Sequence, residues 1–142
     1  MEAKHLADIE AIHQLKARYF RYMDTKQWQL WGSVFTADCH LQVEHEPGVI
    51  GTDVRGREAI VDSVRSALQG TRTVHHGHMP EIEITGPTTA RGIWAMFDFV
   101  SWGPERELKG YGHYHETYRK NPSGRWQIAT LLLTRLRVDP RG

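Results

Sequence analysis

Residues 93–100 read IWAMFDFV and form the most apolar run of the chain. A run of this length and composition, after the polar segment 88–92, predicts a buried β-strand. Asp98 stands inside the run, and an ionised carboxylate in such a strand is unfavourable unless it is paired, hydrogen-bonded or neutral. Either another group of the fold compensates Asp98, or its proton takes part in chemistry.

The patterns around this run predict an α+β fold. Residues 9–24 carry apolar side chains at three- and four-residue steps, Trp28 opens a shorter helical pattern, and residues 57–68 predict a third helix. Residues 47–52 contain a proline and two glycines and are expected to form a turn region. The expected strands cover residues 39–46, 71–78, 81–85, 88–102, 107–119 and 126–138. Helices followed by an antiparallel meander predict helices packed on one face of the sheet.

Length, charge and cysteine content restrict the class of protein. A chain of 142 residues is expected to form a single domain over 1–142. With a net charge of +1, neither nucleic acid nor an anionic membrane is an expected partner. The lone Cys39 excludes an internal disulfide and fits a reducing compartment. Since the sequence has no signal-peptide pattern and no membrane-spanning run, a cytoplasmic protein is expected.

Two of the expected strands are apolar on both faces. Residues 93–100 and 128–136 carry large apolar side chains at odd and even positions alike. An antiparallel sheet with one solvated face should alternate between apolar and polar residues. A partner subunit is the simplest cover for the second face, so a homodimer or homotrimer is expected.

Asp24 stands where the first helix is expected to end, on the same face as Tyr19. A helix C-terminus disfavours a negative charge and raises the pKa of an unpaired carboxylate. The simpler alternative is that Asp24 is a solvated helix-end residue that begins a turn. Helical spacing alone leaves both interpretations open.

The segment 72–78 contains three histidines. If it is a strand, His75 shares a face with Thr73, whereas His76 and His78 lie on the opposite face. Histidine is the commonest general acid or base near neutral pH. The alternative for each is a structural histidine with a satisfied hydrogen bond. The chain has no HExxH or paired-cysteine spacing and no nucleotide-binding glycine motif, so neither a metal nor a cofactor is expected.

Four motifs together resemble the SnoaL-like branch of the nuclear transport factor 2-like superfamily. They are Tyr…Asp-Thr-Lys-x-Trp at 19–28, Thr-Arg-Thr-Val-His at 71–75, Gly-x-x-x-Tyr at 110–114 and Gly-Arg-Trp at 124–126. The resemblance covers nearly the whole chain. It implies a cone-shaped α+β barrel in which a strongly curved, mostly antiparallel sheet wraps around N-terminal helices and leaves a deep pocket. Because this fold hosts enzymes and non-catalytic binding proteins, it does not by itself define a function.

The resemblance also implies site residues. Scytalone dehydratases and hexachlorocyclohexane dehydrochlorinases use an aspartate and a histidine at positions that match Asp24 and His75. Bile acid 7α-dehydratases are similar at Tyr19 and Asp98 as well, and their C-terminal arginine corresponds to Arg135 or Arg137. The chain departs from the scytalone dehydratases at Val100, near the position of their second catalytic histidine.

These residues predict a cofactor-independent dehydratase, another lyase or an isomerase that acts on a small, hydrophobic, cyclic molecule. Asp24 would orient His75 as the base, and Asp98, with its pKa raised by the apolar strand, would protonate the leaving oxygen. Tyr19 would polarise a carbonyl or hydroxyl group of the substrate. The expected substrate-binding residues are Trp28, Trp31, Phe35, Trp94, Met96, Val100, Tyr114 and Arg135.

A second interpretation stays open at this stage. The chain would then be a non-catalytic ligand-binding or oligomerisation module of the same fold. Tryptophan and methionine side chains would fill its pocket, or Asp98 would be paired with Arg135 or Arg137, away from His75.

Overall fold

A computed structural model describes residues 3–141. In this range the chain forms three helices and six strands. The helices are α1 (Ala3–Asp24), α2 (Trp28–Gly32) and α3 (Arg57–Ala67). The strands are β1 (Phe35–Glu46), β2 (Val49–Arg55), β3 (Arg72–Gly86), β4 (Thr89–Gly103), β5 (Arg106–Lys120) and β6 (Trp126–Arg141). None of the helices in this range is both long and apolar enough to cross a membrane.

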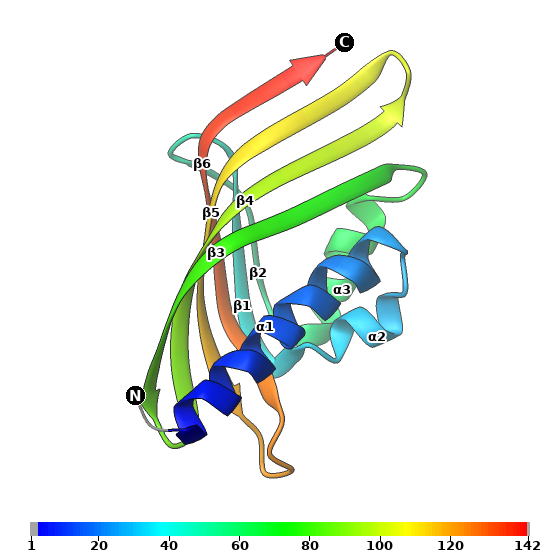
Figure 1. The fold of residues 1–142 in the computed structure, drawn as a ribbon. Helices are drawn as coiled ribbons and strands as arrows, with labels where there is room; N and C mark the ends of the chain where they lie inside the picture. The colour runs from blue at the N-terminus through cyan, green and yellow to red at the C-terminus, as the bar shows by residue number, and fades with distance from the viewer. Residues whose placement is uncertain (1–2, 142) are drawn as a thin grey trace.

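The strands form one mixed sheet in the order β2-β1-β6-β5-β4-β3. The pair β1–β6 is parallel and the other neighbouring strands are antiparallel. The sheet is strongly bent and does not close, and the helices lie on its concave side (Figure 1). The prediction of helices within a curved, mostly antiparallel sheet is therefore confirmed.

Two details of the expected strand pattern were wrong. Only Pro47 and Gly48 separate β1 from β2, so most of the expected turn region 47–52 is strand. Gly48 has a φ of 79°, which permits a tight hairpin. Residues 71–78 and 81–85 belong to one strand, β3, because an extra residue between His78 and Glu81 is absorbed as a bulge opposite β4.

Side-chain alternation along β4 fixes the orientation of Asp98. Trp94, Met96, Asp98 and Val100 are all buried, whereas the residues between them are partly or largely exposed. Because alternate residues of a strand face opposite sides, these four point toward the helices. The apolar-strand prediction therefore places Asp98 in the protein interior.

The core lies between the helices and the inner face of the sheet. From α1 it contains Ile12, Leu15, Tyr19 and Met23, each less than 5 % exposed. Trp31 of α2 is completely buried among them. On the outer face of the sheet the side chains are partly or largely exposed, and the helices leave that face uncovered (Figure 1).

Candidate active site

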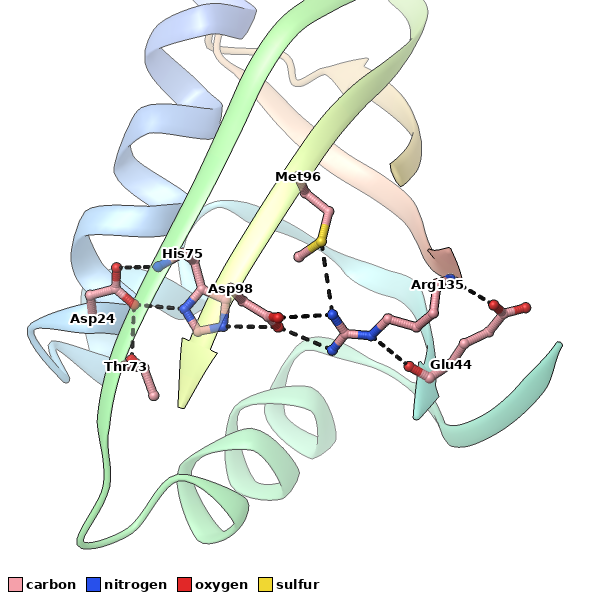
Figure 2. A network of polar contacts seen from close by, with 7 residues as sticks. All are labelled: Asp24, Glu44, Thr73, His75, Met96, Asp98 and Arg135. Atoms are coloured by element: carbon pink, nitrogen blue, oxygen red, sulfur yellow. Dashed lines mark hydrogen bonds and ion pairs between the residues drawn. The ribbon is translucent and has the colours of Figure 1, made fainter. Parts of the chain in front are cut away.

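The carboxylate of Asp24, at the end of α1, accepts three hydrogen bonds from β3. The donors are the hydroxyl of Thr73 at 2.9 Å, the backbone N–H of His75 at 2.8 Å, and Nδ1 of His75 at 2.7 Å (Figure 2). Hydrogen bonds from these donors stabilise a carboxylate that the helix C-terminus would otherwise disfavour. Asp24 is therefore not a solvated helix-end residue.

This contact assigns the tautomer of His75. Because Nδ1 donates this hydrogen bond to Asp24, the neutral imidazole of His75 carries its proton on Nδ1 and has a free lone pair on Nε2. Nε2 lies 3.9 Å from Oδ2 of Asp98, beyond hydrogen-bond distance (Figure 2). His75 is 8 % exposed and lies with Thr73 on the inner face of β3; strand parity had predicted that these two residues share a face. Nε2 is thus the nitrogen of His75 that faces the interior carboxylate.

Asp98 forms a two-pronged ion pair with Arg135 of β6. Nη1 lies 2.9 Å from Oδ1 and Nη2 lies 3.0 Å from Oδ2, and both side chains are less than 10 % exposed. Arg135 is held in turn by Glu44, whose backbone carbonyl accepts from Nε at 3.1 Å. Both carboxylate oxygens of Asp98 thus accept from Arg135, whereas the expected acid role requires a proton on one of them. Asp98 is therefore paired with Arg135, as the non-catalytic interpretation expected. It also lies near His75, as the catalytic interpretation expected.

Gly110 makes room for this ion pair. It lies opposite Asp98 on β5, and a Cβ atom built at this position would overlap the side chains of both Asp98 and Arg135. The glycine of the Gly-x-x-x-Tyr motif is therefore required by close approach rather than by a turn. Arg137, the alternative partner of Asp98, is largely exposed and forms an ion pair with Asp139 instead.

The other expected site residues fall into two groups. Tyr19, Trp31, Phe35, Trp94, Met96, Val100 and Tyr114 are buried on the inner side of the sheet. Met96 also contacts the ion pair, because its sulfur lies 3.8 Å from Nη1 of Arg135. Trp28 is only partly buried and lines two surface hollows beside α3, neither of which includes His75. Of the expected substrate-binding residues, Trp28 is thus the one that lies apart from the others.

A second buried charge cluster was not predicted. Nζ of Lys16 lies 2.6 Å from Oε2 of Glu116, and both side chains are inaccessible to solvent. The ammonium also lies 3.6 Å from the ring centroids of Tyr19 and Tyr114. Burial lowers the pKa of Lys16 to about 8, although Glu116 opposes this shift. Strand parity could have placed Glu116 beside Tyr114, but nothing in the sequence marks Lys16 as its partner.

The same cluster affects the tyrosines. The hydroxyl of Tyr118 donates to Glu116 at 2.7 Å and accepts from Nε1 of Trp94 at 2.8 Å. Burial, reinforced by the charge of Glu116, raises the pKa values of Tyr19, Tyr114 and Tyr118. These phenols therefore stay protonated at neutral pH and can donate hydrogen bonds.

Five surface hollows are lined by residues other than Asp24, His75 and Asp98. Trp31 and Phe35 pack around Tyr19, with ring centroids 5.8 and 6.0 Å from the tyrosine ring. Within the Asp24–His75–Asp98 site, the side chain of Asp24 is the most accessible to solvent, with 20 % of its surface exposed.

A curved sheet around N-terminal helices, with polar residues on its inner face, defines the class of cone-shaped α+β proteins. The chain belongs to the SnoaL-like domain family, whose model matches residues 4–131. No metal-binding group of three or more His, Cys, Asp or Glu side chains occurs within residues 3–141.

Solved structures with the same fold include enzymes and a protein of unknown function. A candidate scytalone dehydratase from Novosphingobium aromaticivorans is 22% identical, with a TM-score of 0.84 over 98% of this chain and 91% of that one. A type 2 hexachlorocyclohexane dehydrochlorinase is 18% identical, with a TM-score of 0.84 over 97% and 91%. A protein of unknown function from Mycobacterium tuberculosis is 23% identical, with a TM-score of 0.81 over 94% and 75%. At these identities the likeness shows a shared fold.

Proposed function

We propose that the chain is a cofactor-independent lyase, of the dehydratase type, or an isomerase, and that it acts on a small, hydrophobic, cyclic molecule. One observation carries the proposal. Asp24 holds Nδ1 of His75 at 2.7 Å, so that Nε2 presents its lone pair to the interior. An oriented imidazole of this kind is the usual general base of enzymes that remove a proton from carbon.

In the proposed reaction, Nε2 of His75 takes a proton from the carbon next to a carbonyl group. The electron pair of the broken C–H bond forms a double bond, and in a dehydration the C–O bond at the neighbouring carbon breaks. The departing oxygen takes a proton from the imidazolium, which releases water and returns His75 to its neutral state. In an isomerisation, the imidazolium returns the proton to a different carbon instead.

Asp98 and Arg135 have electrostatic roles in this proposal. Oδ2 of Asp98, 3.9 Å from Nε2, stabilises the imidazolium that forms when His75 takes the proton. Arg135 holds the carboxylate of Asp98 in place and provides a positive charge close to a developing enolate oxygen. Tyr19 is the proposed hydrogen-bond donor to the substrate carbonyl. In this proposal Asp98 is a fixed anion, and it is not the general acid that the sequence suggested.

Turnover by a His75 variant tests the proposal. Hydroxylated cyclic ketones would be screened for loss of water by absorbance, because elimination creates a conjugated carbonyl. For any substrate found, His75→Gln should lower kcat by at least ~100-fold, the usual contribution of a general base. The exposed His76→Gln, on the opposite face of β3, is the matched control and should keep full activity. Equal activity of the two variants would rule out His75 as the base.

A second function, non-catalytic ligand binding, is favoured by the filled interior. Trp31 and Met96 are buried in the interior, and the alternative interpretation expected tryptophan and methionine side chains to fill the pocket. In this case hydrophobic ligands would bind without being changed. Saturable binding of a cyclic ketone, with unaltered ligand recovered after prolonged incubation, would favour this second function.

A further inference from the structure

Three arginine side chains line one cleft at the end of the sheet where β5 turns into β6. Arg18 comes from α1, Arg57 is the first residue of α3, and Arg125 follows the turn that is drawn in orange at the bottom of Figure 1. The cleft has a volume of about 190 Å³. Its remaining lining residues are neutral: Leu15, Ser33, Val34, Asn121, Trp126 and Gln127.

These three guanidinium groups have no carboxylate partner within 4.0 Å in the described part of the chain, residues 3–141. Arg91 and Arg119, in contrast, each form an ion pair with a neighbouring acid. Since the whole chain has a net charge of only +1, the cluster is a local concentration of positive charge. Like charges around one cleft repel each other, and a bound anion would relieve that repulsion.

Part of the cleft is rigidly held. Arg57 donates from Nε and Nη2 to the carbonyl of Phe35 at 3.0 and 2.6 Å. Gln127 donates to the same carbonyl at 3.2 Å. These bonds fix the guanidinium of Arg57 and leave Nη1 as its unused nitrogen. A donor that is positioned before binding loses little conformational freedom when a ligand arrives.

The turn that carries Arg125 is also fixed, through the side chain of Asn121. Its Oδ1 accepts from the backbone N–H groups of Ser123 and Arg125, both at 3.0 Å, and from the hydroxyl of Ser123 at 2.7 Å. Three donors at one oxygen settle the orientation of the amide. The amide NH₂ of Asn121 is therefore a further donor for the cleft.

We propose that this cleft binds a phosphate group, either as the free anion or as the phosphate ester of a small molecule. Guanidinium groups match phosphate oxygens with paired N–H donors, and a phosphate monoester has a charge of about −1.5 to −2 at neutral pH. At ~30 Å³ per water molecule, the cleft holds roughly six waters, which is enough space for a hydrated tetrahedral anion.

The cleft is separate from the Asp24–His75–Asp98 site. The two sites share no residue. Gly110 is the β5 residue opposite Asp98, and Asn121 follows the far end of β5, roughly 35 Å farther along an extended chain. Phosphate binding therefore does not depend on the proposed reaction at His75.

Isothermal titration of inorganic phosphate into the full chain tests this site, in a chloride buffer of constant ionic strength. We expect saturable binding of one phosphate per chain. Arg18→Gln and Arg125→Gln should each weaken it at least 10-fold, which corresponds to ~1.4 kcal/mol. Arg57→Gln is not the deciding variant, because it also removes the bonds to Phe35. The matched control is Arg106→Gln, at the other end of β5, whose guanidinium lies over the ring of Trp102; it should leave the affinity unchanged.

Two results would overturn the proposal: no saturable heat up to ~10 mM phosphate, or an equal loss of affinity in Arg106→Gln. A parallel titration with glycerol phosphate separates the two sources of the group. Tighter binding of the ester assigns the site to a phosphorylated molecule, and equal affinity assigns it to the free anion. Stronger binding of succinate than of either phosphate compound would reject phosphate as the ligand.

Discussion

Gly110 and Asp98 lie opposite each other on β5 and β4, and the Asp98–Arg135 ion pair fills the space where a side chain at position 110 would stand. The buried carboxylate in the apolar strand is thus compensated by an arginine from β6 that passes over a glycine of β5. Replacement of Asp98, Arg135 or Gly110 should therefore disturb the other two residues.

We therefore expect Gly110→Ala to separate Asp98 from Arg135. Breaking a buried ion pair costs about 3–5 kcal/mol, so the free energy of unfolding should fall by roughly 3 kcal/mol. Denaturant titration measures this change. Lys109→Ala, one residue earlier on the opposite face of β5, is the control and should change stability by less than ~1 kcal/mol. A Gly110→Ala protein as stable as the parent would show that the pair does not need the glycine.

Much of this site could be predicted from local patterns. Strand parity placed His75 with Thr73 and Asp98 with Met96, and helix periodicity placed Asp24 on the face of Tyr19. The choice between Arg135 and Arg137 could not be made, because a register shift between Tyr111 and Gly112 decides which arginine points inward. A shift of this kind depends on pairing with a distant strand and leaves no local sequence signal.

The Lys16–Glu116 pair could not be predicted for a related reason. The two residues are separated by 100 positions in the sequence, and a lysine beside apolar helix positions usually extends its ammonium to solvent. The filled interior also depends on tertiary packing: the positions of Trp31 and Phe35 around Tyr19 follow from the way α2 closes on α1. Sequence patterns therefore identified the polar residues of the site but not the space around them.

The tautomer of His75 is open to direct measurement without a substrate. Since Nδ1 donates to Asp24, we expect ¹⁵N NMR of the neutral imidazole to show a protonated Nδ1 and an unprotonated Nε2. Asp24→Ala should lose this preference and shift His75 toward the Nε2–H tautomer. Thr73→Ala removes another hydrogen bond to the same carboxylate and serves as the control, with the Nδ1–H form retained. An Nε2–H tautomer in the parent protein would contradict the proposed base.

Lys16 should make stability depend on alkaline pH. Its pKa is about 8 in the fold and 10.5 as an ordinary lysine. Below pH ~8 Lys16 is protonated in the folded and in the unfolded chain, so burial of its ammonium group lowers the free energy of unfolding by the full penalty. Between these two values the folded protein releases the proton while the unfolded chain keeps it, so the free energy of unfolding rises with pH. Lys16 alone should contribute a gain of about 2 kcal/mol between pH ~7 and ~9.5. Cys39 opposes it, because burial raises the pKa of its thiol to about 12 whereas the thiol of the unfolded chain ionises near pH ~8.5.

Denaturant titrations across this pH range, on the parent and on Lys16→Met, test the origin of that gain. The methionine variant has no titrating group at position 16, so its free energy of unfolding should show only the loss caused by Cys39 and fall by about 2 kcal/mol relative to the parent over the same range. Lys109→Met, which removes an exposed lysine, is the control and should follow the parent profile. Parallel profiles of the parent and Lys16→Met would mean that Glu116 holds Lys16 charged throughout, which would contradict the lowered pKa of Lys16.

The outer face of the sheet presents a neutral patch with charged margins. In the centre of the patch, His76 of β3 lies beside Phe97 of β4 and Tyr111 of β5. In the next row, His78 lies beside Ala95 and His113 on the same strands. Ion pairs such as Arg91–Glu83 and Arg137–Asp139 lie at the margins. A centre depleted of charged residues within a polar rim is typical of a protein interface.

We expect this outer-face patch to bind a second copy of the chain, because a single neutral patch complements itself about a two-fold axis. Sedimentation velocity at ~50 µM protein should show a dimer for the parent. Phe97→Glu places a charge in the centre of the patch and should give a monomer with an unchanged circular dichroism spectrum. Leu6→Glu adds the same charge at an exposed apolar residue of α1, away from the sheet face, and should remain dimeric. A monomeric parent protein, or a dimer that persists in Phe97→Glu, would exclude the patch as the contact between copies.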